Sequence, residues 1–351
     1  MDFEKELIKT YKTLKKINKK KIIFCIGNTT KIDRVNYFFM PIRLTADLAV
    51  FGIIIFKEKF AKIASKLLDG KVDYIMVDAE KKSLPRNSKN PGNIERTVRE
   101  SLKKTKMLVY KGNDLTVHSI DQSLTYYFNK DIRGLGGKIV LIIGAGNIGS
   151  KLAQVLVERG AKVFIKRRNY KNSLLISKTL NLLIPKHTTE EVKAIKDEEK
   201  IYKYADIVIG ANNGKPVITK KFVEKLKTGG IIVDVGKGTV ENSAILTARK
   251  KNINIFRTDV TIPLVSLIES SIKIEEFSRY NFKIIKYKDY NLVPAGQLGL
   301  KNDIIVDSTE KLNSIYGICN GSGSFYKKLN KNQKKIIKDI KKKYKINYQI
   351  L

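Results

Sequence analysis

The sequence predicts an α/β protein built from an N-terminal α/β domain followed by a doubly wound parallel sheet. Apolar runs with the length of strands alternate with helical patterns along most of the 351 residues, which is the order typical of sheets covered by helices. Several of these runs are continuously apolar, as expected for parallel strands that are buried on both faces. The length suits two domains of about 150 residues each.

Residues 1–130 are predicted to form the first domain. After an amphipathic, Lys-rich segment, strands are expected at residues 21–26, 48–56 and 72–77. Helical spacing of apolar residues occurs at residues 60–68 and 94–104. The stretch 83–93 is rich in Pro, Asn and Gly and predicts a loop. Two short apolar runs around a Lys-Gly-Asn-Asp turn, over residues 106–118, predict a hairpin.

Residues 131–258 repeat the alternation more regularly and predict the second domain. Strands are expected at residues 138–143, 162–165, 205–211, 231–235 and 253–256. Helices are expected at residues 147–159, 174–183 and 219–226. Residues 259–280 predict a helix that returns to the N-terminal domain. Residues 281–351 are expected to be a basic C-terminal extension ending in a Lys-rich helix.

A glycine-rich turn joins the first strand and the first helix of the second domain. Its glycines follow the pattern G-x-G-x-x-G within a strand-turn-helix unit, the context that makes this pattern a Rossmann dinucleotide-binding motif. The first glycine permits the tight turn, the second lets the backbone approach the pyrophosphate, and the third lets helix and strand pack closely. Free N–H groups at the helix N-terminus would bind the phosphates. The predicted coenzyme-binding residues of this turn are Gly144, Ala145, Gly146, Asn147, Ile148 and Gly149.

The end of the following strand predicts which coenzyme is bound. An NAD site usually places Asp or Glu there, about 20 residues after the first glycine, to bind the ribose 2′-hydroxyl. Lys166, Arg167 and Arg168 stand in that place here, and a guanidinium binds a 2′-phosphate well. NADP(H) is therefore favoured over NAD(H). The ends of two later strands add Ala211, Asn212 and Gly236 as predicted coenzyme contacts.

The composition limits the classes of partner and site. A formal net charge of +35 attracts polyanions such as nucleic acid. The basic residues are scattered rather than interleaved with aromatic residues, so nucleic-acid binding is not expected as the main function, although it stays open. Two cysteines and two histidines argue against a metal site or a disulfide framework. No apolar run reaches the roughly 20 residues that span a bilayer; a cytoplasmic protein is expected, and a homodimer is compatible with the sequence.

These motifs resemble the shikimate dehydrogenase and methylene-tetrahydrofolate dehydrogenase group over about residues 22–271. Phe24-Cys-Ile-Gly-Asn28 is similar to the opening strand and turn of shikimate dehydrogenases, and Arg168 falls on the arginine of their 2′-phosphate motif. The segments 205–216 and 231–239 look closer to the folate enzymes. The resemblance implies an NADP-dependent oxidoreductase with catalysis between its two domains. The implied substrate is a small polar hydroxy, keto or imino compound.

The same resemblance implies the catalytic residues. Lys81 or Lys82 lies near the family's catalytic lysine, and Asp121 falls on the aspartate of its Asn-Thr-Asp-Gly motif. A lysine facing a carboxylate can transfer the proton that accompanies hydride transfer. Asn28 and Ser119 are the implied substrate contacts. The serines that hold shikimate in the family are absent, so a non-catalytic NAD(P)-binding protein and a folate-type methylene dehydrogenase stay open as alternatives.

Overall fold

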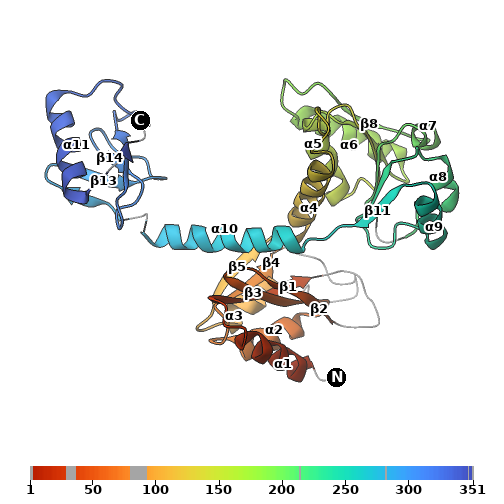
Figure 1. Ribbon diagram of the computed structural model, residues 1–351, viewed down its shortest axis with the longest axis horizontal. Coiled ribbons are helices and arrows are strands. Elements are labelled where there is room, and N and C mark those ends of the chain that lie inside the picture. Colours follow the sequence, from red (N-terminus) through yellow and green to blue (C-terminus); the bar gives the residue numbers. More distant parts are fainter. Residues whose placement is uncertain are drawn as a thin grey trace. The chain divides into compact units, whose positions relative to one another are not determined.

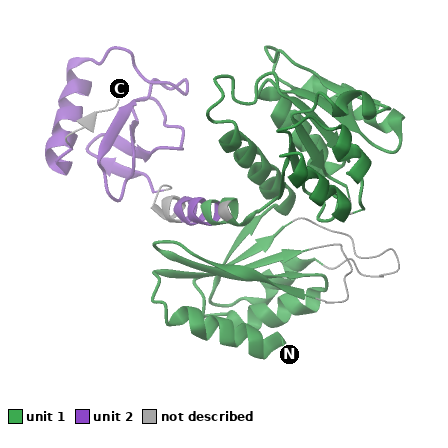
Figure 2. Cartoon of the chain, turned by 45° about the vertical axis from the view of Figure 1, so that its right-hand side comes forward, with its two compact units in different colours: residues 1–266 green, residues 267–351 purple. Residues whose placement is uncertain are grey.

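The structure is a computed structural model that describes residues 3–28, 37–79, 93–212, 215–280, 283–346 and 348–349. It divides into two compact units, Met1–Ser266 and Leu267–Leu351 (Figure 2). The first unit contains two sheets, one within residues 21–110 and one within residues 139–257 (Figure 1). The second unit contains a third sheet.

The first sheet has five strands in the order β2-β3-β1-β4-β5, and all neighbours are parallel except β2 and β3. The strands are β1 (Lys21–Asn28), β2 (Tyr37–Leu44), β3 (Leu48–Ile55), β4 (Tyr74–Asp78) and β5 (Lys106–Tyr110). Its helices are α1 (Phe3–Lys15), α2 (Glu58–Leu68) and α3 (Ile94–Ser101), and all three lie on the same face of the sheet (Figure 1). The predicted strands are confirmed. The sequence does not predict the edge strand β2, because it contains Pro41 and a register irregularity and buries none of its residues.

The predicted hairpin over residues 106–118 is wrong. Only its first half is a strand, β5, and the second half begins α4 (Gly112–Tyr127). The β-branched residues of this stretch favour a strand locally. In the folded chain, however, Val117, Ile120 and Leu124 lie on one side of a helix and are buried against α5. Tertiary burial at helical spacing overrides the local preference.

The second sheet is fully parallel, with six strands in the order β11-β10-β9-β6-β7-β8. This is the doubly wound Rossmann order, in which the direction of winding reverses between β6 and β9. The strands are β6 (Ile139–Ile143), β7 (Lys162–Lys166), β8 (Val192–Ala194), β9 (Ile207–Gly210), β10 (Ile231–Asp234) and β11 (Asn254–Arg257). The helices between them are α5 (Asn147–Glu158), α6 (Tyr170–Leu183), α7 (Glu199–Tyr202), α8 (Lys220–Lys225) and α9 (Asn242–Lys250).

Successive residues of each strand in this sheet pack into two different cores. Val140 and Ile142 of β6 pack with α4, α5 and α6 on one face, whereas Leu141 and Ile143 pack with α7, α8 and α9 on the other. This explains why the strands are continuously apolar in sequence. The predicted doubly wound parallel sheet is confirmed.

The predicted helix at residues 259–280 is present as α10 (Thr261–Tyr280), which crosses the boundary between the two units. Its first residue contacts the N-terminal domain, because the Arg43 Nη2 atom on β2 donates to the Thr261 hydroxyl at 3.3 Å. In the described part of the chain, no helix is long and apolar enough to cross a membrane.

The C-terminal region expected as a basic extension is a folded domain of its own. Its strands are β12 (Ile285–Tyr287), β13 (Tyr290–Pro294), β14 (Ile304–Val306), β15 (Ser314–Ile318) and β16 (Tyr348–Gln349), and its helix is α11 (Lys331–Tyr344). The core contains Leu292, Ile304, Val306, Ile315, Ile318, Ile336, Ile337 and Ile340. The sequence predicted the helix, but its short strands, separated by turns, produced no periodic signal.

Candidate functional site

The glycine-rich turn after β6 has the shape that the motif predicts. Gly144 has a φ of +107°, a conformation that side chains disfavour. A Cβ on Gly144 would lie 2.6 Å from the carbonyl carbon of Ala211, and a Cβ on Gly149 would lie 2.3 Å from the carbonyl oxygen of Gly144. Both glycines are therefore required by close backbone approach between β6, β9 and α5.

Gly146 differs from its two neighbours in the motif. It caps α5 with a φ of −84°, which any residue adopts, and a Cβ there would meet no heavy atom within 4 Å. The space in front of Gly146 is open, at the N-terminus of a helix of 12 residues. Free N–H groups and the positive end of the helix dipole favour a phosphate at this place. The turn thus fits a dinucleotide pyrophosphate.

Two further loops of the parallel sheet border this turn. The Ala211 N–H donates to the carbonyl of Ile143, which holds the end of β9 against the end of β6. A Cβ on Gly236 would lie 2.0 Å from the carbonyl oxygen of Asn212, so the loops after β9 and β10 also touch through their backbones. The Asn212 Oδ1 atom is buried and has no hydrogen-bond partner among the described residues. The predicted contacts Ala211, Asn212 and Gly236 therefore lie together at the carboxyl edge of the sheet, as expected; their binding role stays a prediction.

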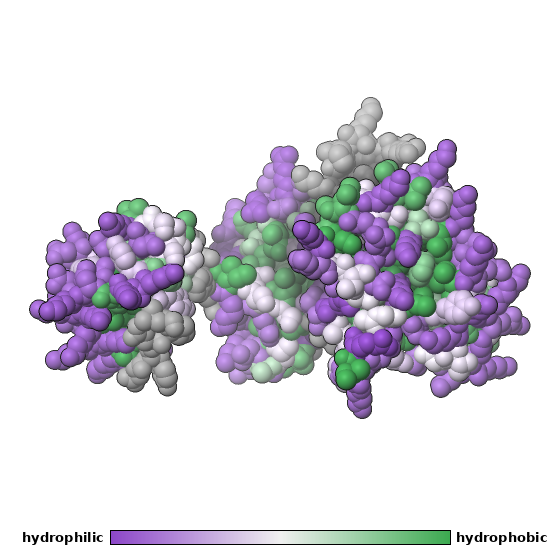
Figure 3. Space-filling view, turned by 90° about the horizontal axis from the view of Figure 1, so that it is seen from above, coloured by the Kyte–Doolittle hydropathy of each residue, from purple (hydrophilic) through white to green (hydrophobic). Residues whose placement is uncertain are grey.

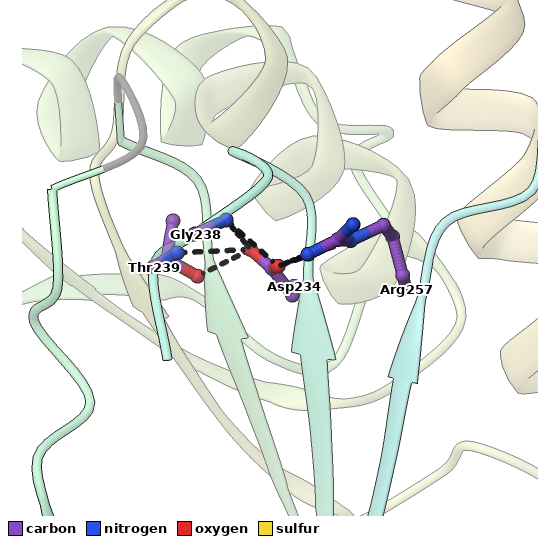
Figure 4. A network of polar contacts seen from close by, with 4 residues as sticks. All are labelled: Asp234, Gly238, Thr239 and Arg257. Carbon is purple, nitrogen blue, oxygen red and sulfur yellow. Dashed lines mark hydrogen bonds and ion pairs between the residues drawn. The ribbon is translucent and has the colours of Figure 1, made fainter. Parts of the chain in front are cut away.

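Asp234 at the end of β10 shapes the neighbouring loop (Figure 4). Its carboxylate accepts hydrogen bonds from the Gly238 N–H at 2.9 Å and from the Thr239 hydroxyl at 2.7 Å. The Arg257 guanidinium at the end of β11 lies 3.2 Å from the same carboxylate. Burial alone would raise the pKa of Asp234, but these donors outweigh it and hold the pKa below its ordinary value. These contacts make Asp234 a structural residue, which holds the loop after β10 against the end of β11.

The three basic residues at the end of β7 have different surroundings. Lys166 forms an ion pair with Glu198, next to α7, and burial lowers the pKa of Lys166. Arg168 is exposed, and within the described ranges neither Arg167 nor Arg168 forms an ion pair. Lys166 is therefore paired within the protein, and its role as a phosphate contact stays a prediction. The sequence does not predict the pairing of Lys166 with Glu198, because the two residues are distant in sequence and meet only in the folded chain.

Asp121 does not stand in an open cleft. It is buried on α4, and the Arg159 guanidinium binds its carboxylate at two points, with Nε at 2.5 Å and Nη2 at 2.7 Å. This pair fastens α4 to the C-terminal end of α5. The ion pair gives Asp121 a structural role, and the catalytic role that the resemblance implied stays a prediction. The proposed catalytic partners Lys81 and Lys82 lie outside the described residues, so the proton-transfer pair stays a prediction.

The two implied substrate contacts are also placed differently from each other. The Ser119 hydroxyl is buried and donates to the backbone carbonyl of Asp259 at 2.6 Å. It is therefore engaged within the protein, and the implied substrate contact stays a prediction. Asn28 is half-buried at the carboxyl end of β1. No cluster of three potential metal ligands occurs among the residues that the structure describes.

Comparison with known families adds to this geometry. Residues 128–255 match the family described as Shikimate / quinate 5-dehydrogenase. Over these residues the Rossmann domain is similar to that family. The family match ends within β11 and so covers all the strand ends that carry the predicted coenzyme contacts. The match confirms the resemblance to NAD(P)-binding dehydrogenases of the shikimate dehydrogenase group that the motifs indicate.

Two glutamyl-tRNA reductases are also similar in sequence. The protein from Thermosipho melanesiensis is 26% identical over 226 residues, which are 60% of this chain and 56% of the relative. The protein from Methanocaldococcus jannaschii is 36% identical over 107 residues, which are 30% of this chain and 25% of the relative. The matches span about half, or less, of the length of these curated relatives.

Solved structures of two-domain proteins also align with the chain. A dipicolinate synthase from Bacillus halodurans has 12% identity and a TM-score of 0.35, covering 73% of this chain and 98% of that one. L-tryptophan dehydrogenase from Nostoc punctiforme has 12% identity and a TM-score of 0.39, covering 69% of this chain and 71% of that one.

Proposed function

We propose that the chain is an NADP(H)-dependent oxidoreductase that acts on a small polar hydroxy, keto or imino compound. The observation that carries the proposal is the open space at Gly146, in a glycine turn that is otherwise closed by backbone contacts. A dinucleotide pyrophosphate is the ligand that this combination of turn and helix N-terminus accommodates.

The choice of NADP(H) rests on the end of β7. Arg167 and Arg168 supply two guanidinium groups that form no ion pair within the described chain. In a bound dinucleotide the adenosine ribose lies at this strand end. A guanidinium there stabilises a 2′-phosphate by paired charge-assisted hydrogen bonds. Because Glu198 already neutralises Lys166, the selectivity rests on the two arginines.

The chain's own residues would position the coenzyme rather than perform the redox step. The nicotinamide supplies the hydride when the coenzyme is bound. The turn from Gly144 to Gly149 would hold the pyrophosphate, and Ala211 and Asn212 would border the path of the nicotinamide half. The buried Asn212 Oδ1, which lacks a donor among the described residues, offers an acceptor in this border. The proton donor is proposed to come from Lys81 or Lys82.

Calorimetric titration with NADP+ and NAD+ tests the coenzyme proposal. Arg168→Ala should weaken NADP+ binding by about 10-fold to 100-fold, the value of a charge-assisted contact of about 1.5–3 kcal/mol. NAD+ binding should change little. Lys178→Ala, an exposed substitution on α6, is the matched control that removes one positive charge elsewhere. Equal losses for both coenzymes, or for both variants, would contradict selectivity through the arginine.

A non-catalytic coenzyme-binding protein is the second candidate. It is favoured by Asp121 and Ser119, which are both engaged inside the protein instead of facing a substrate. The two candidates differ in turnover. The oxidoreductase should oxidise NADPH, followed by its absorbance, with at least one member of a panel of small keto and imino acids. Tight NADPH binding without turnover on the whole panel would favour the second candidate.

A further inference from the structure

The C-terminal domain presents a row of lysines on α11 that the proposed oxidoreductase function does not use. Helical periodicity places residues that are 3, 4, 7 and 11 positions apart on one side of a helix. The lysines with this spacing, called here the lysine face, are Lys331, Lys334, Lys335, Lys338 and Lys342, and all five are exposed. The row is about 16 Å long, at about 1.5 Å per residue. The surface of the C-terminal unit is largely hydrophilic (Figure 3).

The positive charge of the lysine face is offset only in part within the described structure, by Asp339, whose pKa is lowered first by Lys288 and further by Lys335 and Lys342. Asp339 is the single acidic residue of α11, and its carboxylate is bound by Lys288 at 2.6 Å. None of the five lysines forms an ion pair or hydrogen bond with another described residue. The helix α1 is different, because its lysines share the helix with Glu4 and Glu6. The positive potential is therefore expected to be stronger along α11 than along α1.

The opposite side of α11 is fixed to the domain. Ile336, Ile337 and Ile340 are buried in the core with residues of β13, β14 and β15. A capping box between Asn330 and Gln333 fixes the start of the helix. The lysines are thus held in register before any partner binds. A membrane is a poor partner for this helix, because its apolar side is already buried and cannot enter the lipid.

We propose that the lysine face of α11 binds the phosphate backbone of a nucleic-acid duplex. A DNA duplex carries one negative charge about every 1.7 Å along its axis when both strands are counted, so a face about 16 Å long lies against a dense array of phosphates. All five side chains of the face are lysines, which carry no ring on which unpaired bases of a single strand could stack. Lysines bind phosphates without reading bases, so the binding should be independent of sequence and strongly dependent on salt.

The test compares two variants of the full-length protein that lose the same charge. One changes the five lysines of the lysine face to Gln. The control changes five exposed lysines of the N-terminal helix region to Gln: Lys5, Lys9, Lys12, Lys15 and Lys16. Binding to a fluorescent DNA duplex of about 20 base pairs is measured by anisotropy from about 50 to 300 mM salt. Circular dichroism and urea unfolding check that both variants fold, and NADP+ titration is carried out as a separate measurement.

The lysine-face variant should lose more than about 10-fold in affinity near 0.1 M salt, and its salt slope should fall by about 3 to 4. The control should lose less than about 3-fold. Equal losses in both variants, or no binding by the unchanged protein, would overturn the proposal. The proposal would also be overturned if the lysine-face variant lost binding to anionic phospholipid vesicles but kept its binding to the duplex. The result is independent of the coenzyme proposal, because NADP+ binding is read separately.

Discussion

Asp121 on α4 and Arg159 at the end of α5 form a two-point ion pair. It joins the helix that follows β5 in sequence to the first helix of the Rossmann domain. The Asp121 side chain is 9% exposed and the Arg159 side chain is 38% exposed. A pair of this kind stabilises the docking of two helices, and its removal leaves a largely buried group unsatisfied.

Asp121→Asn should therefore lower the free energy of unfolding by about 1–2 kcal/mol, a value reduced because Arg159 is partly hydrated. Coenzyme affinity should not change. Urea unfolding and calorimetric titration measure the two quantities. The control is Glu100→Gln, which removes an exposed pair with Arg96 and should cost less than about 0.5 kcal/mol. If Asp121→Asn abolished turnover while leaving stability unchanged, the catalytic role implied by the resemblance would regain support.

Alanine substitutions at two glycines of the motif should affect different properties, stability at Gly144 and coenzyme binding at Gly146. Gly144→Ala should cost about 2–4 kcal/mol of stability, because it adds φ strain and an overlap with Ala211. Gly146→Ala should leave stability within about 0.5 kcal/mol, since its Cβ enters open space. It should still weaken NADP+ binding by 10-fold or more, on the order of 1.4 kcal/mol, because the Cβ stands where the pyrophosphate approaches. Unchanged NADP+ binding in Gly146→Ala would show that the coenzyme does not use this turn.

The carboxylate of Asp234 should make stability depend on acid pH. Its pKa is lowered in the folded state, so its contribution is present above the ordinary aspartate pKa, near 4, and is lost as the pH falls through the lowered value. Asp234→Asn should lower the free energy of unfolding by about 1–3 kcal/mol at pH 7. The difference from the unchanged protein should shrink below about pH 4. A difference that stayed constant from pH 7 to pH 3, in guanidinium unfolding series, would contradict this assignment.

The thiol of Cys25 should report the opening of the N-terminal domain. It is fully buried on β1, and burial raises its pKa to about 12. Reaction with a disulfide reagent at pH 8 therefore requires unfolding of the sheet, since the thiolate is the reactive form. In a Cys319→Ser background, labelling should be slow in buffer and fast in denaturant. Rapid labelling of the native protein would show that β1 is accessible without global unfolding.

The sequence by itself determined the Rossmann domain and its glycine turn. Continuous apolar strands, helices between them and three glycines at fixed spacing are local signals, and each has a direct physical cause in the fold. Gly144 and Gly149 are required by backbone contacts within a few residues or with the adjacent strand. For this reason the strand ends carrying Ala211, Asn212 and Gly236 could also be placed at one edge of the sheet.

Other properties were decided only by tertiary structure, because they depend on partners distant in sequence. Glu198 pairs with Lys166 across the fold, and Arg159 engages Asp121 between two helices. The first residues of α4 are predicted as part of a hairpin, because their preference for a strand is overridden only by burial against α5. The sequence does not predict the C-terminal sheet, because strands of two to five residues are too short to show a periodic pattern. Their apolar residues form a core only together with α11. Long-range burial and charge pairing thus decided which of the predicted residues remain exposed to bind a ligand.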